Sequence, residues 1–436
     1  MCGGALHCFV VEAESVEALG RNSATFAGTW FEVLLAWPKQ SNCQRPMRDY
    51  DTYWQKRLGE LAASGRRRCL RVLDRRSALR VRVEKGRELL DVSSNDYLGL
   101  SHHPALIARA NEYSLAWGVG AASSRLVGGN LPPAERVEAA LATFKGMEAA
   151  LLFASGVQAN LTMLPALLDP KTLGAEPLVY ADRLNHASLI QGCVAAGVRQ
   201  IRFRHNDLAH LCELLEQDRE RSQPRFIISE TVFSMDGDSP DLPTLTALAA
   251  RYGAFLYLDE AHASGVLGPG GAGLAHGLRN ALVMGTFSKG LGGFGAYATC
   301  SDTLRDYLIN RCGGVIYSTA LPPSVLGAME AALELIPTLE AERAHVQQLA
   351  TRFRERLIAA GLDIGRSTTQ IVPLIVGHER RALALAAALE EAGFFAVPIR
   401  PPTVPAGTSR IRFAFSACHR SEDVERLADS VIRLML

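Results

Sequence analysis

The strongest constraint on the fold is an alternation of short apolar runs with helical stretches between residues 100 and 300. The runs include "LLFAS", "LVYAD", "IRFRH", "FIISE", "FLYLDE" and "ALVMGTF", and most are followed by Gly, Asp, Ser or Asn. Such alternation is typical of a mostly parallel sheet between layers of helices. In these sheets, functional side chains gather where the strands end. The sequence therefore predicts an α/β fold with its chemistry at one edge of the sheet.

A second, smaller unit is expected after this region. The stretch "LEAERAHVQQLATRFRERL" has apolar residues at helical spacing, namely Val346, Leu349, Phe353 and Leu357. It leads into two further strand candidates, "IVPLIVG" and "SRIRFAFS". We therefore predict a large domain over residues 101–332 and a smaller C-terminal α+β domain over 333–436, joined by a long helix.

The N-terminal residues differ from the rest of the chain. Residues 1–50 have no sustained period, so we expect an extension that is disordered or a start-site artefact, with the working protein beginning near Met47. The segment "MRDYDTYWQKRLGELAASG" then predicts a helix whose one side carries Tyr53, Leu58, Leu61 and Ala62. Residues 51–100 would form this N-terminal helix and an arm.

Composition excludes several classes of protein. The chain has 436 residues, 48% of them hydrophobic, and a net charge of +1, so no overall field attracts nucleic acid or a membrane surface. Its nine cysteines are scattered, without metal-ligand spacing, which indicates reduced thiols and no metal site. No apolar stretch has the roughly 20 residues of a membrane helix, and we see no signal peptide, so we expect a cytoplasmic protein. The arginine-rich "GRRRCLRVLDRR" is most simply a solvated face.

Five polar residues follow the predicted strands: His186, Ser234, Asp259, His262 and Lys289. Taken singly, each has an ordinary structural explanation, since histidines often complete a core and aspartates often cap helices. Lys289 is harder to explain in this way. It lies in "TFSKGLGG", between hydroxyl residues and glycines that permit close approach of a ligand.

The combination fits pyridoxal phosphate. This cofactor needs a lysine amine for a Schiff base, supplied by Lys289, and a carboxylate against its ring nitrogen, supplied by Asp259. The carboxylate keeps the nitrogen protonated, so that the ring can accept electrons. His262 and Ser234 could donate hydrogen bonds to the ring hydroxyl.

The remaining parts of such a site are also available. Backbone N–H groups of Gly156 and Val157 would open a helix after "LLFAS" and could bind the phosphate. Thr286 could add a hydroxyl to the phosphate site. His186 could cover one face of the ring.

From about Trp54 to the C-terminus, the sequence resembles the α-oxoamine synthases, a branch of the fold-type I pyridoxal-phosphate enzymes. The resemblance rests on "SSNDYLGLSHHP", "SGVQAN", "ADRLNHASL", "VFSMDGD", "LDEAHASGVLG" and "TFSKG". Two further segments, "IYSTALPP" and "IRPPTVPAGTSRIR", are similar to the branch that serves biotin biosynthesis. That branch joins L-alanine to a pimeloyl thioester, carried by coenzyme A or acyl carrier protein, with release of carbon dioxide and the thiol.

The resemblance also implies roles for individual residues. Lys289 would hold the cofactor and remove the α-proton of alanine, while Asp259 would stabilise the ring nitrogen. His186 would stack on the ring and contact the substrate carboxylate. Arg412 would bind that carboxylate through a two-point fork, with Asn95 as a further substrate contact.

The acyl substrate would lie near Thr403. Arg66 is the arginine that the resemblance assigns to substrate binding, with Arg67 and Arg68 as rivals. Ser318 and Thr319 would contact the cofactor phosphate of a neighbouring subunit, which predicts an obligate homodimer with shared active sites.

Three alternatives remain open. A sister enzyme would use glycine or serine, or another acyl carrier. An aminotransferase would interconvert the aldehyde and amine forms of the cofactor. A non-catalytic binding protein could retain the fold, although the presence of Lys289, Asp259 and His262 argues against it.

Overall fold

The computed structural model describes residues 49–436. Contacts group Leu61–Leu436 into one compact unit, and the residues up to Glu60 into another. Helix α2 (Asp51–Ala63) confirms the predicted N-terminal helix, but none of its residues is buried. Nearly all of the expected extension, residues 1–48 with Met47 among them, lies outside the described residues.

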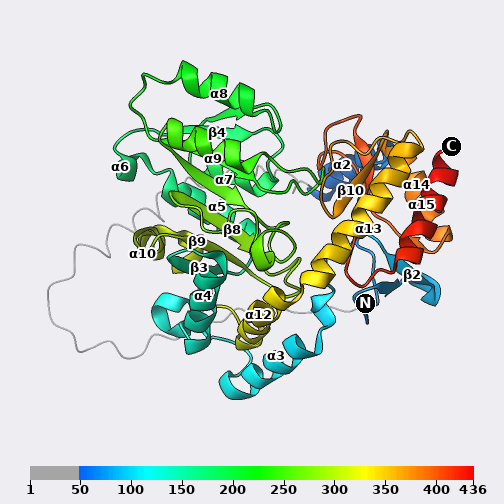
Figure 1. The fold of residues 1–436 in the computed structure, drawn as a ribbon, viewed down its shortest axis with the longest axis horizontal. Coiled ribbons are helices and arrows are strands. Elements are labelled where there is room, and N and C mark those ends of the chain that lie inside the picture. The colour runs from blue at the N-terminus through cyan, green and yellow to red at the C-terminus, as the bar shows by residue number, and fades with distance from the viewer. Residues whose placement is uncertain (1–48) are drawn as a thin grey trace, which may run out of the picture. The chain divides into compact units, whose positions relative to one another are not determined.

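Figure 1 shows the order of the elements along the chain. The strands are β1 (Arg80–Arg82), β2 (Glu88–Asp91), β3 (Ala149–Phe153), β4 (Leu178–Asp182), β5 (Gln200–Phe203), β6 (Arg225–Glu230), β7 (Ala254–Asp259), β8 (Ala281–Thr286), β9 (Ala296–Cys300), β10 (Ile371–Gly377), β11 (Phe394–Phe395), β12 (Pro398–Ile399) and β13 (Ser409–Ala414). After α2, the helices are α3 (Pro104–Trp117), α4 (Pro132–Lys145), α5 (Gly156–Leu167), α6 (Pro170–Leu173), α7 (Ala187–Ala195), α8 (Leu208–Gln217), α9 (Leu242–Arg251), α10 (Asp302–Arg311), α11 (Gly313–Ile316), α12 (Pro323–Leu335), α13 (Glu340–Ala359), α14 (Glu379–Glu391) and α15 (Ser421–Met435).

The central sheet has seven strands in the order β3-β9-β8-β7-β6-β4-β5. Only β9 runs antiparallel to its neighbours, β3 and β8. The other six strands run in one direction, so their carboxyl ends meet at one edge of the sheet. This is the mostly parallel α/β sheet that the alternating pattern predicts.

Helices cover both faces of this sheet because its strands are apolar on both sides. On one face, Phe153, Val179 and Met284 pack with residues of α5, α7 and α10. On the other face, Tyr180 and Val283 pack with residues of α8 and α9. The layers hold the strand ends rigidly, which fixes the loops that follow them.

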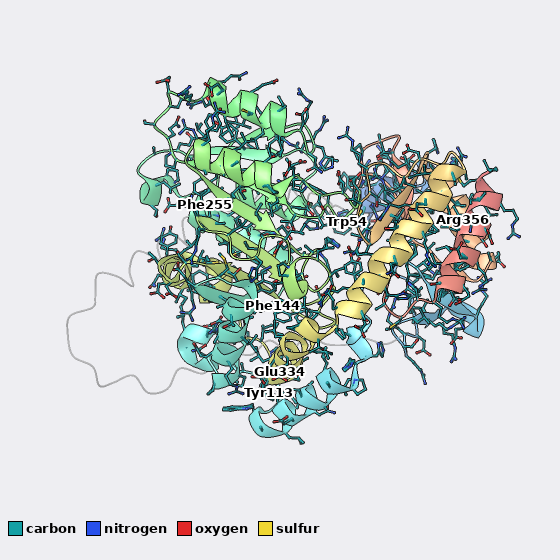
Figure 2. The ribbon with its side chains drawn as sticks, in the orientation of Figure 1. Trp54, Tyr113, Phe144, Phe255, Glu334 and Arg356 are labelled. Atoms are coloured by element: carbon teal, nitrogen blue, oxygen red, sulfur yellow. The ribbon has the colours of Figure 1, made fainter. Side chains whose placement is uncertain are left out.

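Helices α3 and α12 pack against each other beside the sheet. Tyr113 and Glu334, labelled in Figure 2, lie on the two facing helices. Arg109 joins the helices through Glu330 at 2.7 Å and Glu334 at 3.1 Å. The expected domain boundary near residue 332 falls within α12.

The C-terminal region has a core of its own. Strands β10, β13 and β12 form an antiparallel sheet, and β1, β2 and β11 form another three-stranded sheet. Helix α13 buries the four residues predicted from its spacing, namely Val346, Leu349, Phe353 and Leu357. Leu349, Phe353 and Leu357 pack with residues of β10 and β13 and of helices α14 and α15, whereas Val346 belongs to the core cluster that includes residues of α12. Among residues 49–436, no helix has both the length and the apolar character that a membrane crossing requires.

Candidate active site

A cavity of about 850 Å³ brings together seven of the residues singled out in the sequence. They are Asn95, His186, Ser234, His262, Lys289, Thr403 and Arg412. The first lies before α3, four follow strands of the central sheet, and the last two come from the C-terminal region. The parallel strands and the C-terminal region thus form the walls of one site.

Lys289 follows β8 in the cavity wall, and its side chain is only partly exposed. Its amine has no hydrogen-bond or ion-pair partner among residues 49–436. Burial lowers the pKa of Lys289 to about 8, although Asp259 and Glu230 act in the opposite direction. The Lys289 amine therefore loses its proton at a lower pH than an ordinary lysine does.

Asp259 is the last residue of β7 and is buried. One carboxylate oxygen accepts a hydrogen bond from the Asn160 side chain at 3.0 Å, and the other accepts one from the backbone of Ala261 at 2.9 Å. The same Asn160 amide donates to Ser188 at 2.9 Å, and Ser188 lies 2.7 Å from the Nδ1 atom of His186. Asp259 and His186 are therefore held by one chain of hydrogen bonds.

His186 precedes α7 and caps that helix. Its backbone N–H donates to the carboxylate of Glu230 at 2.6 Å. Burial lowers the pKa of His186. Burial, together with the nearby Asp259, raises the pKa of Glu230 well above its usual range. At neutral pH, His186 is therefore an uncharged ring, suited to stacking against a flat ligand.

His262 lies three residues after Asp259, and its pKa is well below the usual range because the ring is buried. Its Nδ1 atom is 2.6 Å from the phenol oxygen of Tyr97, and its carbonyl accepts a hydrogen bond from Gln370 at 2.8 Å. These contacts leave the Nε2 atom for a group in the cavity.

Arg412 is a buried cation in the cavity wall, on β13. Its Nε donates to the carbonyl of Ser234 at 2.5 Å, and its Nη2 donates to Tyr97 at 3.2 Å. Within residues 49–436, it has no carboxylate partner, and its Nη1 has no hydrogen-bond partner. Because an unpaired buried charge is costly, the site is suited to an anionic ligand.

Thr286 provides a test of whether a phosphate fits. Its hydroxyl is buried and lacks a hydrogen-bond partner within the described part of the chain. It lies beside the start of α5, since a methyl group added to Gly156 would be 3.0 Å from Thr286 Cγ2. The cap residue Ser155 accepts from Gln158, which leaves the N–H groups of Gly156 and Val157 for a ligand. An unpaired hydroxyl beside a helix N-terminus suits a phosphate.

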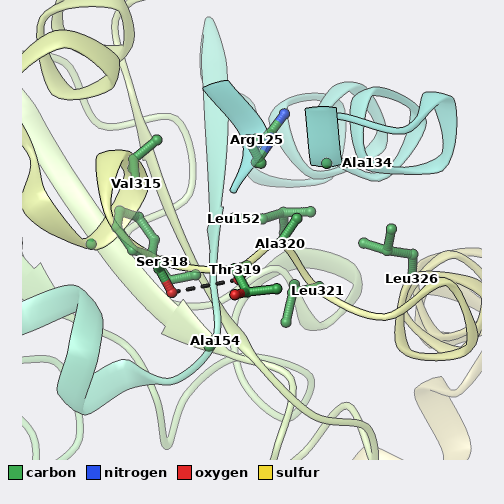
Figure 3. A pocket seen from close by; sticks show the side chains of 13 residues that line it. Arg125, Ala134, Leu152, Ala154, Val315, Ser318, Thr319, Ala320, Leu321 and Leu326 are labelled. Atoms are coloured by element: carbon green, nitrogen blue, oxygen red, sulfur yellow. Dashed lines mark hydrogen bonds between the residues drawn. The ribbon is translucent and has the colours of Figure 1, made fainter. Parts of the chain in front are cut away.

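Two predicted residues lie together outside the main cavity. Ser318 and Thr319 line a small hollow of about 20 Å³, where Figure 3 shows them near Leu152 and Ala154. Ser318 accepts a hydrogen bond from Gln158, on the first turn of α5, at 2.8 Å. Within this chain, Ser318 and Thr319 therefore lie next to the first turn of α5.

Arg66 does not line the cavity. Its guanidinium is paired with Glu379 at 2.7 Å and borders a separate hollow. Of the two rivals, Arg68 donates to the hydroxyl of Thr403 at 3.2 Å, a residue of the cavity wall, whereas Arg67 borders a third hollow. Of these arginines, Arg68 thus contacts a residue of the cavity wall, whereas Arg66 is paired with Glu379.

Three buried residues of the site were not singled out from the sequence: Tyr97, Asn160 and Glu230. Each lies within or beside a recognised segment, "SSNDY", "SGVQAN" or "FIISE". Their positions in these segments were a usable signal. Their partners could not be read from the sequence, because Tyr97 and His262 are 165 positions apart.

The chain is similar to known proteins over most of its length. A family model described as aminotransferase class I and II matches residues 87–431. A protein of Gluconacetobacter diazotrophicus, named 8-amino-7-oxononanoate synthase, is 55% identical over 388 residues, covering 88% of this chain and 97% of that protein.

Two solved structures extend the comparison. A serine palmitoyltransferase variant from S. paucimobilis, with a bound PLP–myriocin aldimine, has a TM-score of 0.82 at 26% identity and covers 89% of this chain and 98% of its own. An 8-amino-7-oxononanoate synthase from Francisella tularensis has a TM-score of 0.68 at 25% identity, covering 79% and 97%.

Proposed function

Since the chain belongs to the class I and II aminotransferase family, and within it to the 8-amino-7-oxononanoate synthases, we propose that it joins L-alanine to a pimeloyl thioester. The α-carbon of alanine would bond to the acyl carbonyl carbon, the thiolate carrier would leave, and the alanine carboxyl group would leave as carbon dioxide. The observation that carries the proposal is that one cavity is lined by both Lys289 and Arg412. The pKa of Lys289 is lowered, and Arg412 has no carboxylate partner among residues 49–436.

Pyridoxal phosphate is the cofactor of this enzyme family. When bound, it supplies an electron sink that stabilises negative charge on the substrate α-carbon. We propose that Lys289 holds it covalently and that Asp259 faces its ring nitrogen. The hydrogen bonds from Asn160 and Ala261 hold the Asp259 carboxyl group in a fixed orientation for this role.

The other cofactor contacts follow from the same geometry. The N–H groups of Gly156 and Val157, with the orphan hydroxyl of Thr286, would bind the phosphate. His186 would lie against the ring face. His262 and Ser234 would face the ring hydroxyl, since both line the cavity.

The Lys289 amine is also suited to proton transfer. A group whose pKa is near the working pH exists in both protonation states, which makes it an effective general base and acid. Lys289 would take the α-proton of alanine and later return a proton to the same carbon. Its enclosure in the wall limits exchange of that proton with bulk water.

Arg412 would position the amino acid. Its Nε and Nη2 groups are held by Ser234 and Tyr97, so the guanidinium is fixed in orientation before substrate binds. A carboxylate bound to the free Nη1 edge, with Asn95 nearby in the wall, is held at a set angle to the cofactor ring. That angle selects which bond of the α-carbon breaks.

Arg68 and Thr403 would bind the acyl substrate. The Arg68 guanidinium donates to Thr403 and to the carbonyls of Arg400 and Pro401, and it has no carboxylate partner among residues 49–436. The pimeloyl chain ends in a carboxyl group, the anion that an arginine fork binds well. Arg68 would therefore fix the far end of the acyl chain.

We also propose that the enzyme is a homodimer in which Ser318 and Thr319 serve the neighbouring active site. Thr319 pairs with Ser124 in an isolated β-bridge, which brings the short π-helix Arg125–Gly129 beside them. In this region Val127 and Tyr317 are 83% and 85% exposed. Large apolar side chains exposed together mark a surface that another protein chain covers.

Turnover assays with the purified protein test the function. Protein loaded with pyridoxal phosphate is given L-alanine with pimeloyl-CoA or with the pimeloyl acyl carrier protein, and 8-amino-7-oxononanoate is measured by mass spectrometry. Glycine and L-serine replace alanine in parallel reactions. We expect the product with alanine and kcat/KM at least tenfold lower with the other two. Preference for serine or glycine would show that the chain is a sister synthase.

A further inference from the structure

Tyr97 lies at the junction of three residues that the proposed function uses. It belongs to the segment "SSNDY" and is fully buried. Its phenol O–H donates to Asn95 Oδ1 at 3.1 Å, and its oxygen lies 2.6 Å from His262 Nδ1. Arg412 Nη2 donates to the same oxygen at 3.2 Å. One phenol therefore contacts the expected cofactor side and the expected substrate side of the cavity.

The hydrogen-bonding capacity of this phenol is fully used. A tyrosine hydroxyl has one proton to donate and can accept two hydrogen bonds. Its three neighbours match that capacity, so no group is left over for a ligand. Tyr97 is also absent from the residues that line the cavity. Burial raises its pKa, which keeps the phenol protonated at neutral pH.

We infer that Tyr97 is a positioning residue, which fixes the His262 ring and the Arg412 guanidinium relative to each other. The inference rests on the proposed function, because it assigns His262 to the cofactor hydroxyl and Arg412 to the alanine carboxylate. With Nδ1 of His262 committed to Tyr97, only Nε2 remains for the cofactor. With Nη2 of Arg412 committed, the Nη1 edge remains for the substrate.

The rest of the pocket supports a positioning role. The other polar contact of His262 is a backbone one, from Gln370, which does not set the angle of the ring. The other hydrogen bond of Arg412 goes to the carbonyl of Ser234. Tyr97 is therefore the side chain through which the two groups are joined.

Tyr97→Phe tests the inference, because it removes the hydroxyl group and keeps the aromatic ring in the apolar core where Tyr97 packs. Tyr180→Phe is the matched control. Tyr180 is also fully buried, and its phenol donates to Asp218 at 2.7 Å, outside the cavity. Circular dichroism and thermal unfolding establish that both variants fold.

Two readouts separate positioning from a purely structural role. The first is the pH titration of the visible absorption band of the cofactor-loaded protein without substrate. We expect its midpoint to move by about one pH unit in Tyr97→Phe. The second is the dissociation constant of L-alanine from the same band, which should rise roughly 10- to 100-fold, as expected for a lost hydrogen bond to a charged group. Tyr180→Phe should change neither readout.

A Tyr97→Phe protein with the band midpoint and alanine affinity of the unmodified protein would overturn the inference. If Tyr97→Phe does not fold, 3,5-difluorotyrosine at position 97 keeps the ring and oxygen but changes the acidity of the phenol. It should move the band midpoint, and an unmoved midpoint would again contradict the inference. The band titration needs no substrate, so failure of the alanine reaction in the unmodified protein would refute the proposed function alone.

Discussion

Arg410 and Arg412 stand two residues apart on β13, on the same face of the strand. Among the residues that the structure describes, Arg410 has a carboxylate partner and Arg412 has none. Arg410 pairs with Asp236 at 2.7 Å, whereas the Arg412 guanidinium donates hydrogen bonds to the Ser234 carbonyl and to the Tyr97 hydroxyl. The two arginines are equally buried, so the difference is one of pairing. A paired arginine stabilises the fold, and an unpaired one in a cavity is available to an anion.

The first prediction compares these two arginines. Arg412→Lys keeps the charge but removes the planar fork, so the KM for L-alanine should rise roughly 10- to 100-fold. Arg410→Lys should leave that KM within about twofold and lower the thermal midpoint, because it weakens the pair with Asp236. Steady-state kinetics and thermal unfolding measure both effects. Equal rises in KM for the two variants would contradict the assignment of Arg412.

The second prediction concerns the pKa of Lys289. The rate at which cofactor-free protein captures pyridoxal phosphate should rise with pH up to a midpoint near 8, since only the neutral amine attacks an aldehyde. Below that midpoint, the rate should fall about tenfold per pH unit. Because Asp259 raises the pKa of Lys289, Asp259→Asn should move the midpoint to lower pH. Stopped-flow absorbance gives the profile, and a midpoint near 10 in both proteins would refute the assigned pKa.

The third prediction concerns the imidazolium of His205. It joins two loops of the site, with ring nitrogens 3.0 Å from Asp182, ahead of His186, and 3.0 Å from Asp238, after Ser234. Burial alone would lower its pKa, but the two carboxylates raise it to about 10. Because the pKa of His205 is raised in the folded protein, its ion pairs contribute fully to the free energy of unfolding below about pH 6.5. This contribution is lost as the pH rises through about 10.

His205→Gln should therefore lower the free energy of unfolding by about 2 kcal/mol at pH 6, and by less as pH approaches 10. Urea denaturation at several pH values measures the difference. A constant difference from pH 6 to 10 would mean that His205 is not charged.

The fourth prediction tests the dimer. Val127→Glu combined with Tyr317→Glu places two charges on the exposed apolar surface beside Thr319. We expect sedimentation to show a monomer with at least tenfold lower kcat, because Ser318 and Thr319 no longer reach a neighbouring site. Ile358→Glu, at an exposed apolar position on α13, should remain dimeric and active. A monomeric double variant with full activity would contradict shared sites.

Much of this arrangement follows from the sequence because a parallel sheet brings its strand ends together. Once "FLYLDE" and "ALVMGTF" are neighbouring strands, Asp259 and the segment before Lys289 must meet at one edge. The antiparallel β9 did not stand out, since "AYATC" is short and mostly small.

Side-chain contacts between segments that are far apart in the sequence could not be predicted from the strand pattern. Arg66, Arg67 and Arg68 have the same side-chain chemistry. The path of the chain after α2 places Arg66 against Glu379 and Arg68 against Thr403. The contacts of Tyr97 depend likewise on packing between the segment that precedes α3 and strand β13. Sequence pattern fixes the elements, and tertiary packing selects the partners.

The most direct test of the central claim is the site of cofactor attachment. Protein loaded with pyridoxal phosphate is reduced with borohydride, digested with protease and examined by peptide mass spectrometry. We expect a phosphopyridoxyl group on Lys289 and no visible absorption band in Lys289→Ala. Attachment at another lysine, or an unchanged band in Lys289→Ala, would contradict it.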